Sequence, residues 1–370
     1  MGIKVSASPS GDLKKLIQEI DQPRIKAVVY FFSIEFERFE PHKALKRAFP
    51  QAACIGMSMS GGWCTAGAVE KGLVAMSFSE DEVEAVFTSL KENAASDSAG
   101  AAKDVIADLK RKLGRGPINP NAYLGIVLFS FPCRGEEIMK AFTTEKDLNL
   151  PFIGGVAGDE LTFTKTLVAV DEKQSAEGLG VMVLKMKIPF FCNHYVHCVP
   201  TNTAVTITKA DTVTRTVWEI DGQGAAPYYA KLIGLPNVET LKPGDFAAHP
   251  MGIVVGDQVY VRSINTLAEG NIGLACACEL EPHTKVHILK LGDIIDNARK
   301  AVLDAGSFTP NLQGAILFNC VGRYLELKQL GKTAVFNDAF KQLSFIGCNT
   351  YGEELFTHHN QTLTAVFFGR

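Results

Sequence analysis

The sequence predicts a mixed α/β fold in which helices pack on layered sheets and one strand–helix–strand–hairpin unit is repeated. The first observation is a recurring pattern. At residues 345–355, an apolar strand leads to a glycine, polar residues and two carboxylates, and the same arrangement occurs at residues 152–161. A fainter copy lies at residues 54–62. Such self-similarity indicates a duplicated or triplicated unit.

The second observation is the spacing within the copies. Val28 precedes Gly56 by as many positions as Ile126 precedes Gly154, and the interval in the third copy is slightly longer. We therefore expect the three glycine segments to occupy equivalent places in similar substructures. Each glycine is expected in a turn that ends a strand.

The first copy begins near the amino terminus. The apolar run at residues 27–32 is typical of a strand that is covered on both faces. Pro41 suits the first turn of a helix. Residues 80–113, rich in Ala, Lys, Glu and Asp, are predicted as a long helix with an interruption near 96–100. The other elements expected in this copy are strands at 4–6, 52–57 and 69–78 and helices at 11–20 and 41–49.

The second and third copies repeat this order. The second is predicted to contain strands at 124–130, 161–170 and 178–187, a helix at 135–142, and a turn at 171–173 that joins the last two strands. The third is predicted to contain strands at 314–320, 344–347 and 361–368 and a mainly helical stretch at 322–343. Layered sheets covered by helices follow from this alternation.

The segment between the second and third copies has a different pattern. Residues 190–200, between two prolines, are a plausible domain boundary. Beyond it the sequence predicts hairpins at 204–220 and 252–261, the second with a Gly-Asp turn. Residues 236–250 are expected to be a loop. Further elements are expected as helices at 222–232 and 293–305 and strands at 273–278 and 285–289.

The composition excludes several classes of protein. The 370 residues have a net charge of −3, with 46% hydrophobic and 21% charged residues, which is ordinary for a globular chain of two or three domains. No basic excess indicates a nucleic-acid partner, and no apolar run is long enough to span a membrane. The nine cysteines are scattered and several lie in apolar runs, which favours reduced thiols in a cytoplasmic protein.

Two segments of the third copy combine residues suited to ligand binding. Cys320 and Arg323 follow a buried strand and open a helix, where ligands often bind in α/β sheets and where Arg323 could hold a carboxylate. Asn349, Tyr351 and Glu353 follow the next strand and could recognise an ammonium group. The structural alternatives are tight turns, solvated carboxylates, and an Arg323 ion pair, for example with Glu326.

Other candidate chemistry is weaker. Cys320 is a possible nucleophile with His358 or His359 as its partner, although a buried inert thiol is the more common state. Cys192, His194, His197 and Cys198 match no common zinc spacing, so we expect no metal and no cofactor, with haem as an alternative. No Walker sequence, dinucleotide fingerprint, His-Glu-x-x-His or Gly-x-Ser-x-Gly motif is present.

The motifs resemble those of the FIST family, with an N-terminal domain at residues 1–192 followed by a C-terminal domain at residues 193–370. In the N-terminal half the resemblance lies in Leu-Pro-Phe-Ile-Gly-Gly-Val-Ala-Gly-Asp at 150–159 and the hairpin after it. In the C-terminal half it lies in Cys-x-x-Arg at 320–323, Tyr-Gly-Glu at 351–353 and His-Asn-Gln-Thr at 359–362. The chain departs from the family at the first glycine segment, whose lining of Met57, Met59 and Trp63 is unusually apolar.

The resemblance implies an intracellular sensory module that binds a small ligand such as an amino acid, with no established reaction. No F-box, kinase or cyclase segment is present, so the chain would signal through a separate output protein. We predict that six residues contribute to one ligand cavity: Cys320, Arg323, Asn349, Tyr351, Glu353 and His359. The alternatives are an enzyme using Cys320 as nucleophile or Glu353 in acyl or amide transfer, a haem-based gas sensor, and a protein-interaction scaffold.

Overall fold

The computed structural model describes residues 2–114, 116–309 and 311–370. The chain forms two compact units. The first comprises residues 1–195, 298–358 and 363–370, and the second comprises residues 196–297 and 359–362. The chain thus leaves the first unit close to the expected boundary at 192 and later returns to it. The division into domains 1–192 and 193–370 stays a prediction.

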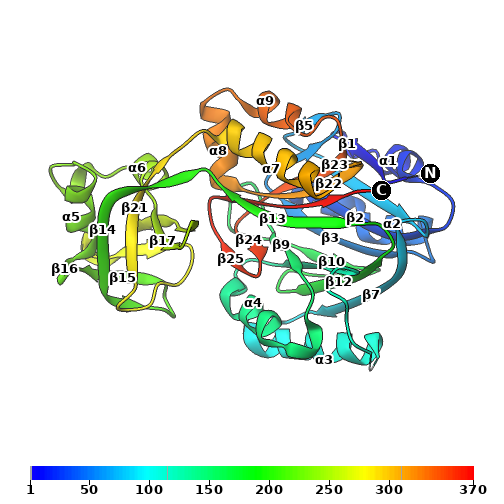
Figure 1. Cartoon of the computed structure of the whole chain (residues 1–370), viewed down its shortest axis with the longest axis horizontal. Coiled ribbons are helices and arrows are strands. Elements are labelled where there is room, and N and C mark those ends of the chain that lie inside the picture. Colours follow the sequence, from blue (N-terminus) through cyan, green and yellow to red (C-terminus); the bar gives the residue numbers. More distant parts are fainter. Residues whose placement is uncertain (1, 115, 310) are drawn as a thin grey trace. The chain divides into compact units, whose positions relative to one another are not determined.

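The first unit contains three copies of one strand–helix unit (Figure 1). The first copy comprises β1 (Lys4–Ser8), α1 (Leu13–Ile20), β2 (Ile25–Ser33), the 3-10 helix η1 (Ile34–Phe39), α2 (Pro41–Ala48), β3 (Ala53–Met59), the hairpin strands β4 (Gly62–Cys64) and β5 (Gly67–Val69), and β6 (Leu73–Ser79). Its strands and helices confirm the predicted order.

The second copy has the same elements. It comprises β7 (Val83–Lys91), α3 (Ser98–Leu113), β8 (Tyr123–Phe129), α4 (Gly135–Thr144), the 3-10 helix η2 (Lys146–Leu148), β9 (Phe152–Val156), the hairpin strands β10 (Val168–Val170) and β11 (Lys173–Ser175), and β12 (Leu179–Met186). The third comprises β13 (Phe190–Val196), α7 (Ile294–Phe308), β22 (Gly314–Cys320), α8 (Val321–Gln329), α9 (Thr333–Asp338), β23 (Ser344–Thr350), the hairpin strands β24 (Glu353–Leu355) and β25 (Thr357–His359), and β26 (Thr362–Phe368).

The copies form three six-stranded sheets with the same strand order: β1-β6-β2-β3-β10-β11, β7-β12-β8-β9-β24-β25 and β13-β26-β22-β23-β4-β5. Each sheet has one parallel pair at its centre, β2–β3, β8–β9 or β22–β23. A helix connects the two strands of each pair, as a parallel crossover requires. The triplication predicted from the sequence is therefore confirmed by the topology.

The sheets exchange their hairpins in a ring. β10 of the second copy pairs with β3 of the first, β24 of the third pairs with β9 of the second, and β4 of the first pairs with β23 of the third. Each copy therefore completes the sheet of a neighbouring copy. No copy forms its six-stranded sheet alone, which explains why the three belong to one compact unit.

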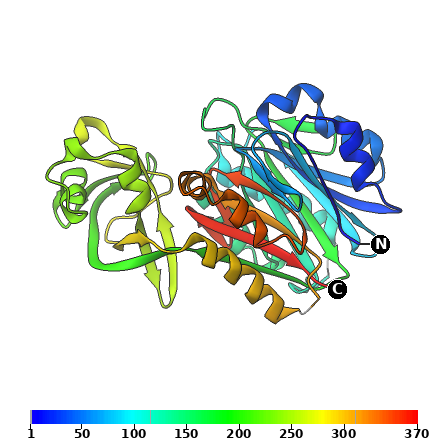
Figure 2. The ribbon, with the colours of Figure 1, turned by 90° about the horizontal axis from the view of Figure 1, so that it is seen from above.

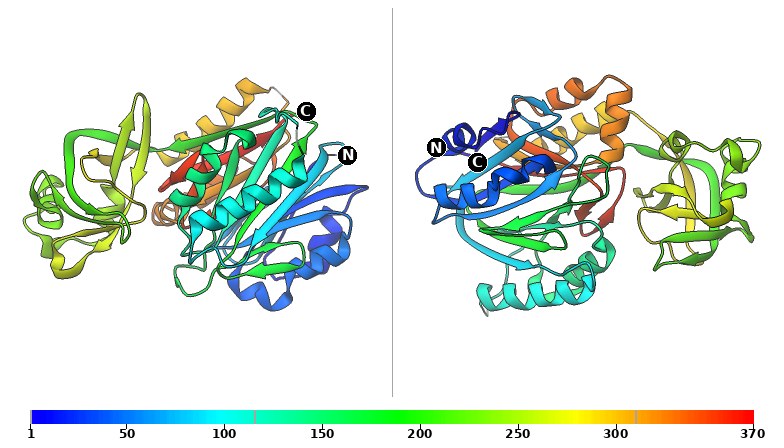
Figure 3. Two further views of the ribbon diagram at one scale, coloured as in Figure 1. Left: turned by 90° about the horizontal axis from the view of Figure 1, so that it is seen from below. Right: turned by 180° about the vertical axis from the view of Figure 1, so that it is seen from behind.

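Alternating side chains of the central strands divide the apolar interior into layers. In β2, Val29 and Phe31 belong to a core shared by all three sheets, while Val28 and Tyr30 pack with α1 and α2. The second sheet has its own layer against α3 and α4, which includes Phe129. These helices cover the outer faces of their sheets (Figures 2 and 3). Burial on both faces accounts for the continuous apolar runs in the sequence.

The structure corrects the expectation that the repeat glycines lie in turns. They lie inside strands, Gly56 in β3, Gly154 in β9 and Gly347 in β23. A Cβ on Gly154 would lie 1.7 Å from the carbonyl oxygen of Val127, and one on Gly56 would lie 2.5 Å from the Tyr30 ring. Glycine is thus required by close packing within the sheet and not by a turn.

Three other expectations need correction. Residues 80–113 do not form one helix: their first part is β7, whose Val83, Val86 and Phe87 suit an extended strand paired with β12. Residues 161–167 are not a strand, and β10 pairs with β3 and β11, while β12 pairs with β7 and β8. The expected loop at 236–250 includes two short helices, η3 (Val238–Thr240) and α6 (Pro243–Ala248).

The second unit is mainly β-structure with its own apolar core. Its strands form one sheet path, β18-β17-β21-β14-β15-β20-β19, with β16 beside β15. It comprises β14 (Cys198–Asp211), β15 (Thr216–Ile220), β16 (Gln223–Gly224), α5 (Ala225–Leu232), η3, α6, β17 (Met251–Val255), β18 (Gln258–Arg262), β19 (Ile264–Leu267), the 3-10 helix η4 (Glu269–Asn271), β20 (Leu274–Cys276) and β21 (Lys285–Leu291).

Candidate functional site

The carboxyl ends of β3, β9 and β23 meet within the first unit, because each receives a hairpin from another copy. Backbone hydrogen bonds join these ends: Ser60 N–H donates to Asn349 O (3.1 Å), Gly158 N–H to Ser58 O (3.0 Å) and Tyr351 N–H to Val156 O (3.1 Å). Polar side chains gather where the strands end. We call the following set the carboxyl-end cluster: Ser60, Trp63, Asn319, Arg323, Asn349, Thr350 and Glu353.

Asn349 is the centre of this cluster and is fully buried. Its Oδ1 accepts hydrogen bonds from Trp63 Nε1 at 2.8 Å and Asn319 Nδ2 at 3.1 Å. Its Nδ2 donates to the carbonyl oxygen of Ser60 at 3.0 Å. One amide therefore ties β23 to β22 of its own copy and to the hairpin of the first copy. A buried amide of this kind needs such partners.

Arg323 extends the cluster from the first turn of α8. Its side chain is fully buried, and its Nε donates to Asn319 Oδ1 at 3.0 Å. Cys320 is the residue immediately before α8 and is also buried. The strand-to-helix turn thus brings a cation and a thiol to the end of β22, as the sequence predicted.

Glu353 is a fully buried carboxylate at the start of β24. Its Oε1 accepts a hydrogen bond from Thr350 Oγ1 at 2.8 Å. Burial and, to a smaller extent, the charge of Glu353 raise the pKa of the nearby Cys348 thiol well above its usual value. A charged group held in the interior is costly unless other groups compensate it, so its presence needs a structural or functional reason.

Tyr351 and Asp159 form a second polar group at the same strand ends. The Tyr351 hydroxyl donates to Asp159 Oδ1 and accepts from the N–H of Leu161 at 2.7 Å. Burial and then this hydrogen bond to Asp159 raise the pKa of Tyr351 to about 12. Burial alone would raise the pKa of Asp159, but hydrogen bonds from Tyr351, Lys165 N–H and other loop donors outweigh it and lower that pKa. Asp159 therefore stays ionised and holds the loop at 159–165.

Glu354 and His358 make a buried pair across the β24–β25 hairpin. His358 Nδ1 lies 2.6 Å from Glu354 Oε1, and both side chains are almost completely enclosed. A Cβ on Gly135 would lie 2.4 Å from His358 Nδ1, and one on Gly352 would lie 2.3 Å from His358 Cε1. The imidazole thus occupies space that a side chain at either glycine would need.

His359 belongs to the second unit, together with the loop that follows it. Its ring stacks on Tyr260 with centroids 5.7 Å apart. In the same loop, Gln361 accepts from Ser263 Oγ at 3.1 Å and donates to Ala247 O at 3.0 Å. The His-Asn-Gln-Thr motif therefore anchors this loop within the second unit.

The structure brings some of the six predicted residues into direct contact networks. Arg323 and Asn349 are linked through Asn319, Glu353 contacts Thr350, and Tyr351 contacts Asp159. A groove of about 850 Å³ in the first unit lies elsewhere, and none of the six lines it. That these residues contribute to one ligand cavity stays a prediction.

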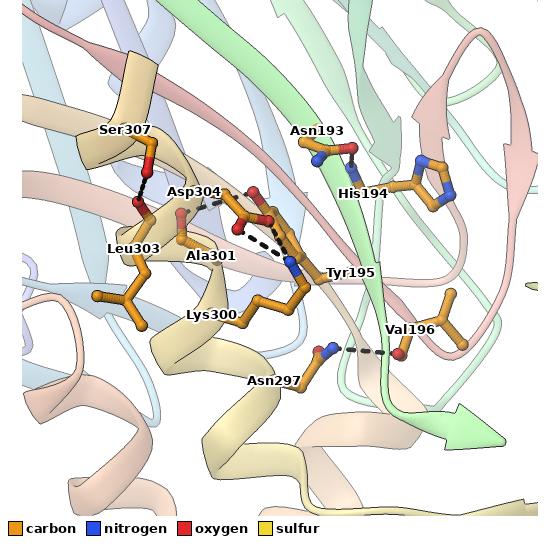
Figure 4. A network of polar contacts seen from close by, with 10 residues as sticks. All are labelled: Asn193, His194, Tyr195, Val196, Asn297, Lys300, Ala301, Leu303, Asp304 and Ser307. Atoms are coloured by element: carbon orange, nitrogen blue, oxygen red, sulfur yellow. Dashed lines mark hydrogen bonds and ion pairs between the residues drawn. The ribbon is translucent and has the colours of Figure 1, made fainter. Parts of the chain in front are cut away.

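The cysteine- and histidine-rich segment at 192–198 passes from β13 into β14. Asn193 Oδ1 accepts from the His194 N–H at 2.8 Å, and Tyr195 donates to Ala301 O at 3.5 Å (Figure 4). Burial lowers the pKa of His194. Across residues 2–114, 116–309 and 311–370, no three His, Cys, Asp or Glu side chains are grouped to hold a metal ion.

Several residues of the site were not predicted. Asn319 and Thr350 lie in the strands that flank the proposed ligand residues, and Trp63 comes from another copy altogether. The repeat gives a signal for Trp63, because Trp63 is the middle residue of a hairpin strand and pairs with the repeat glycine Gly347. The exchange itself leaves no local signal in the sequence.

Comparison with known families matches residues 26–223 to the FIST N domain and residues 225–355 to the FIST C domain. The chain belongs to the FIST family. The tandem order of two FIST domains is thereby confirmed. FIST domains are sensory domains of signal transduction, so the family places this chain in small-ligand sensing. No curated protein matches the chain.

In the described part of this FIST protein, no helix has both the length and the apolar character needed to cross a bilayer.

Proposed function

We propose that this FIST protein is a sensor that binds a small zwitterion of the amino-acid class at the carboxyl-end cluster. The observation that supports the proposal is the burial of Arg323 and Glu353 at the ends of neighbouring parallel strands. A guanidinium suits a ligand carboxylate, and a carboxylate suits an ammonium group. Trp63 and Asn319 occupy both acceptor sites of Asn349 Oδ1, so a ligand would meet this amide through the second hydrogen of its Nδ2.

Arg323, Asn349 and Glu353 all belong to the third copy. In the equivalent hairpin positions the first copy has Gly62 and the second has Val168, whereas the third has Glu353. The scaffold therefore does not require a carboxylate there. A buried carboxylate that the equivalent positions of the other copies lack is a reasonable ligand contact.

The proposal includes a separate output protein and a reducing, cytoplasmic location. Of the nine cysteines, eight are buried, and no two of them form a disulfide. This arrangement supports a reducing compartment. The sensory role of the family supports signalling to an output protein.

The test is calorimetric titration of the purified chain with each of the standard amino acids, together with mass spectrometry of small molecules that co-purify. Arg323→Lys keeps the charge but loses the planar fork, so we expect ligand affinity to fall by about 1–3 kcal/mol. Because Arg323 Nε also bonds Asn319, the melting temperature should fall as well.

A matched control separates the two effects. Asn319→Ala removes the same hydrogen bond, and also the one to Asn349 Oδ1, but keeps the guanidinium, so it should lower the melting temperature and weaken ligand binding less than Arg323→Lys. Equal binding losses in the two variants, or unchanged binding in Arg323→Lys, would assign Arg323 a structural role. Retention of binding in Cys320→Ala would separate the sensor from the alternative with a nucleophilic thiol.

A further inference from the structure

The turn residue at the tip of each exchanged hairpin faces the beginning of a neighbouring central strand. In the first sheet, Asp171 Oδ1 accepts a hydrogen bond from the Cys54 N–H at 3.1 Å. In the third sheet, Thr65 Oγ1 accepts from the Phe345 N–H at 3.0 Å. A polar side chain thus closes the hairpin against the strand in both places.

The second sheet differs at the equivalent position. Leu355 pairs with Ile153, so the next hairpin residue, Phe356, is opposite Phe152 in the same register. A phenyl ring cannot accept the hydrogen bond that Asp171 accepts. Phe356 has φ +59°, close to the +53° of Asp171, but its side chain is 58% exposed. Phe356 thus has a backbone conformation like that of Asp171, but its side chain cannot make the hydrogen bond that Asp171 makes to the neighbouring strand.

A groove of about 850 Å³ lies beside this open tip. Small-molecule sites usually have volumes of about 300–1,000 Å³ and mainly apolar walls. Aromatic side chains from four parts of the first unit line the groove: Phe142 of α4, Phe190 of β13, Phe308 at the end of α7, and Phe356. These rings favour an apolar body, and the lining also includes polar side chains such as Asn121, Thr143 and Asn149.

One cation at the rim of the groove is available to an anionic ligand. Glu145 also lines the groove, and Lys110 Nζ lies 3.2 Å from its carboxylate and 2.7 Å from that of Asp147, so one lysine is shared by these two carboxylates. Lys146 also lines it, and among the described residues the Lys146 ammonium has no ion pair or side-chain hydrogen bond. A ligand with one anionic head and an apolar tail therefore matches both the wall and the rim.

We propose that this groove binds an amphiphilic carboxylate of the fatty-acid class, with its tail against the phenylalanine rings and its carboxylate near Lys146. The site is distinct from the carboxyl-end cluster, because its lining includes none of the residues that form the cluster. The chain would then respond to a second ligand chemistry, through the hairpin that holds Glu353 and Glu354.

The test uses the full chain and sodium decanoate below its micellar concentration, with binding measured by calorimetry. Phe356→Asp copies the closure that Asp171 provides, and aspartate tolerates the left-handed turn. We expect this variant to fold and to lose decanoate binding by more than tenfold. Lys146→Gln should weaken binding by about fivefold, the effect of one exposed charge contact.

Two controls define the outcome. Lys140→Gln changes an exposed lysine on α4 outside the groove lining and should leave decanoate binding unchanged. Decyltrimethylammonium has the same tail with a cationic head and should bind more weakly than decanoate. The melting temperature of Phe356→Asp shows whether that variant is folded, and Phe308→Ala tests the opposite wall if it is not.

The proposal is overturned if the unchanged chain shows no saturable decanoate binding, or if Phe356→Asp and Phe308→Ala both bind decanoate normally. Equal affinity for the cationic amphiphile would overturn the role of Lys146. Because Arg323→Lys leaves the groove intact, it should keep decanoate binding whether or not the proposed amino-acid site is correct.

Discussion

The hairpins of the three copies occupy the same place in their sheets but differ in chemistry. In the first strand of each hairpin, the middle residue pairs with a repeat glycine. These middle residues are Ala169, Trp63 and Glu354, and the residues before them are Val168, Gly62 and Glu353. Two copies thus fill the position with apolar or small side chains, and the third buries two carboxylates. At these two hairpin positions, a shared scaffold therefore buries carboxylates in one copy alone.

We expect the largest loss of stability where a repeat glycine lies closest to the neighbouring strand. In Gly154→Ala the new Cβ would lie 1.7 Å from the backbone oxygen of Val127, which cannot move without separating β8 from β9. We expect a loss of about 3 kcal/mol or more in the free energy of unfolding. Urea denaturation followed by circular dichroism measures it.

The matched variant is Gly347→Ala in the third copy. Its Cβ would lie 2.9 Å from Leu317 Cβ, a milder overlap, so the loss should be smaller than for Gly154→Ala. If the two variants were equally stable, or both as stable as the unchanged chain, the close approach of the strands would not be the reason for the glycines.

The sequence allows the repeat to be predicted because strand, helix and glycine recur at a regular spacing. It also predicts Arg323 and Asn349 at one sheet edge, and the structure links these two side chains through Asn319; that they bind a ligand stays a prediction. It cannot reveal that the hairpins are exchanged, because pairing between distant segments depends on the folded sheets. The β7 segment is predicted as helix because the stretch 80–113 is rich in Ala, Lys, Glu and Asp, whereas pairing with β12 decides the conformation of its first part.

A second test concerns the polar link between copies. Asn349→Ala would leave the buried Trp63 Nε1 without its acceptor and remove the bond to Asn319. We expect a loss of about 2–3 kcal/mol, since an orphaned buried donor keeps its desolvation cost. Ser58→Ala, in the first copy, removes one bond from Leu167 N–H and should cost less. A smaller loss for Asn349→Ala than for Ser58→Ala would contradict the central role of Asn349.

The third test uses pH to compare Asp159 with a surface carboxylate. Because the pKa of Asp159 is lowered in the folded state, its contribution is present above the unfolded pKa of about 3.9 and is lost as the pH falls below it. Asp159→Asn should therefore cost about 1–2 kcal/mol at pH 7 and less near pH 3. Urea titrations at several pH values measure the difference, and the exposed Asp21→Asn should show little change. A pH-independent loss in Asp159→Asn would mean that ionisation is not its source.

The smallest effects are expected at the hairpin tips, where the comparison between copies is most direct. Thr65→Val removes a hydroxyl that accepts from Phe345 N–H and donates to Leu343 O at 2.9 Å, so it should cost about 1 kcal/mol. Asp171→Ala should have a similar effect, because its carboxylate accepts from Cys54 N–H. Phe356→Ala should change the free energy of unfolding by less than about 0.5 kcal/mol, since its ring is exposed and makes no hydrogen bond to the neighbouring strand.

Thermal and urea unfolding of the three variants measure whether the losses follow this order. A loss in Phe356→Ala as large as in the other two would mean that the ring packs as part of the fold, and the second sheet would then be closed like its neighbours.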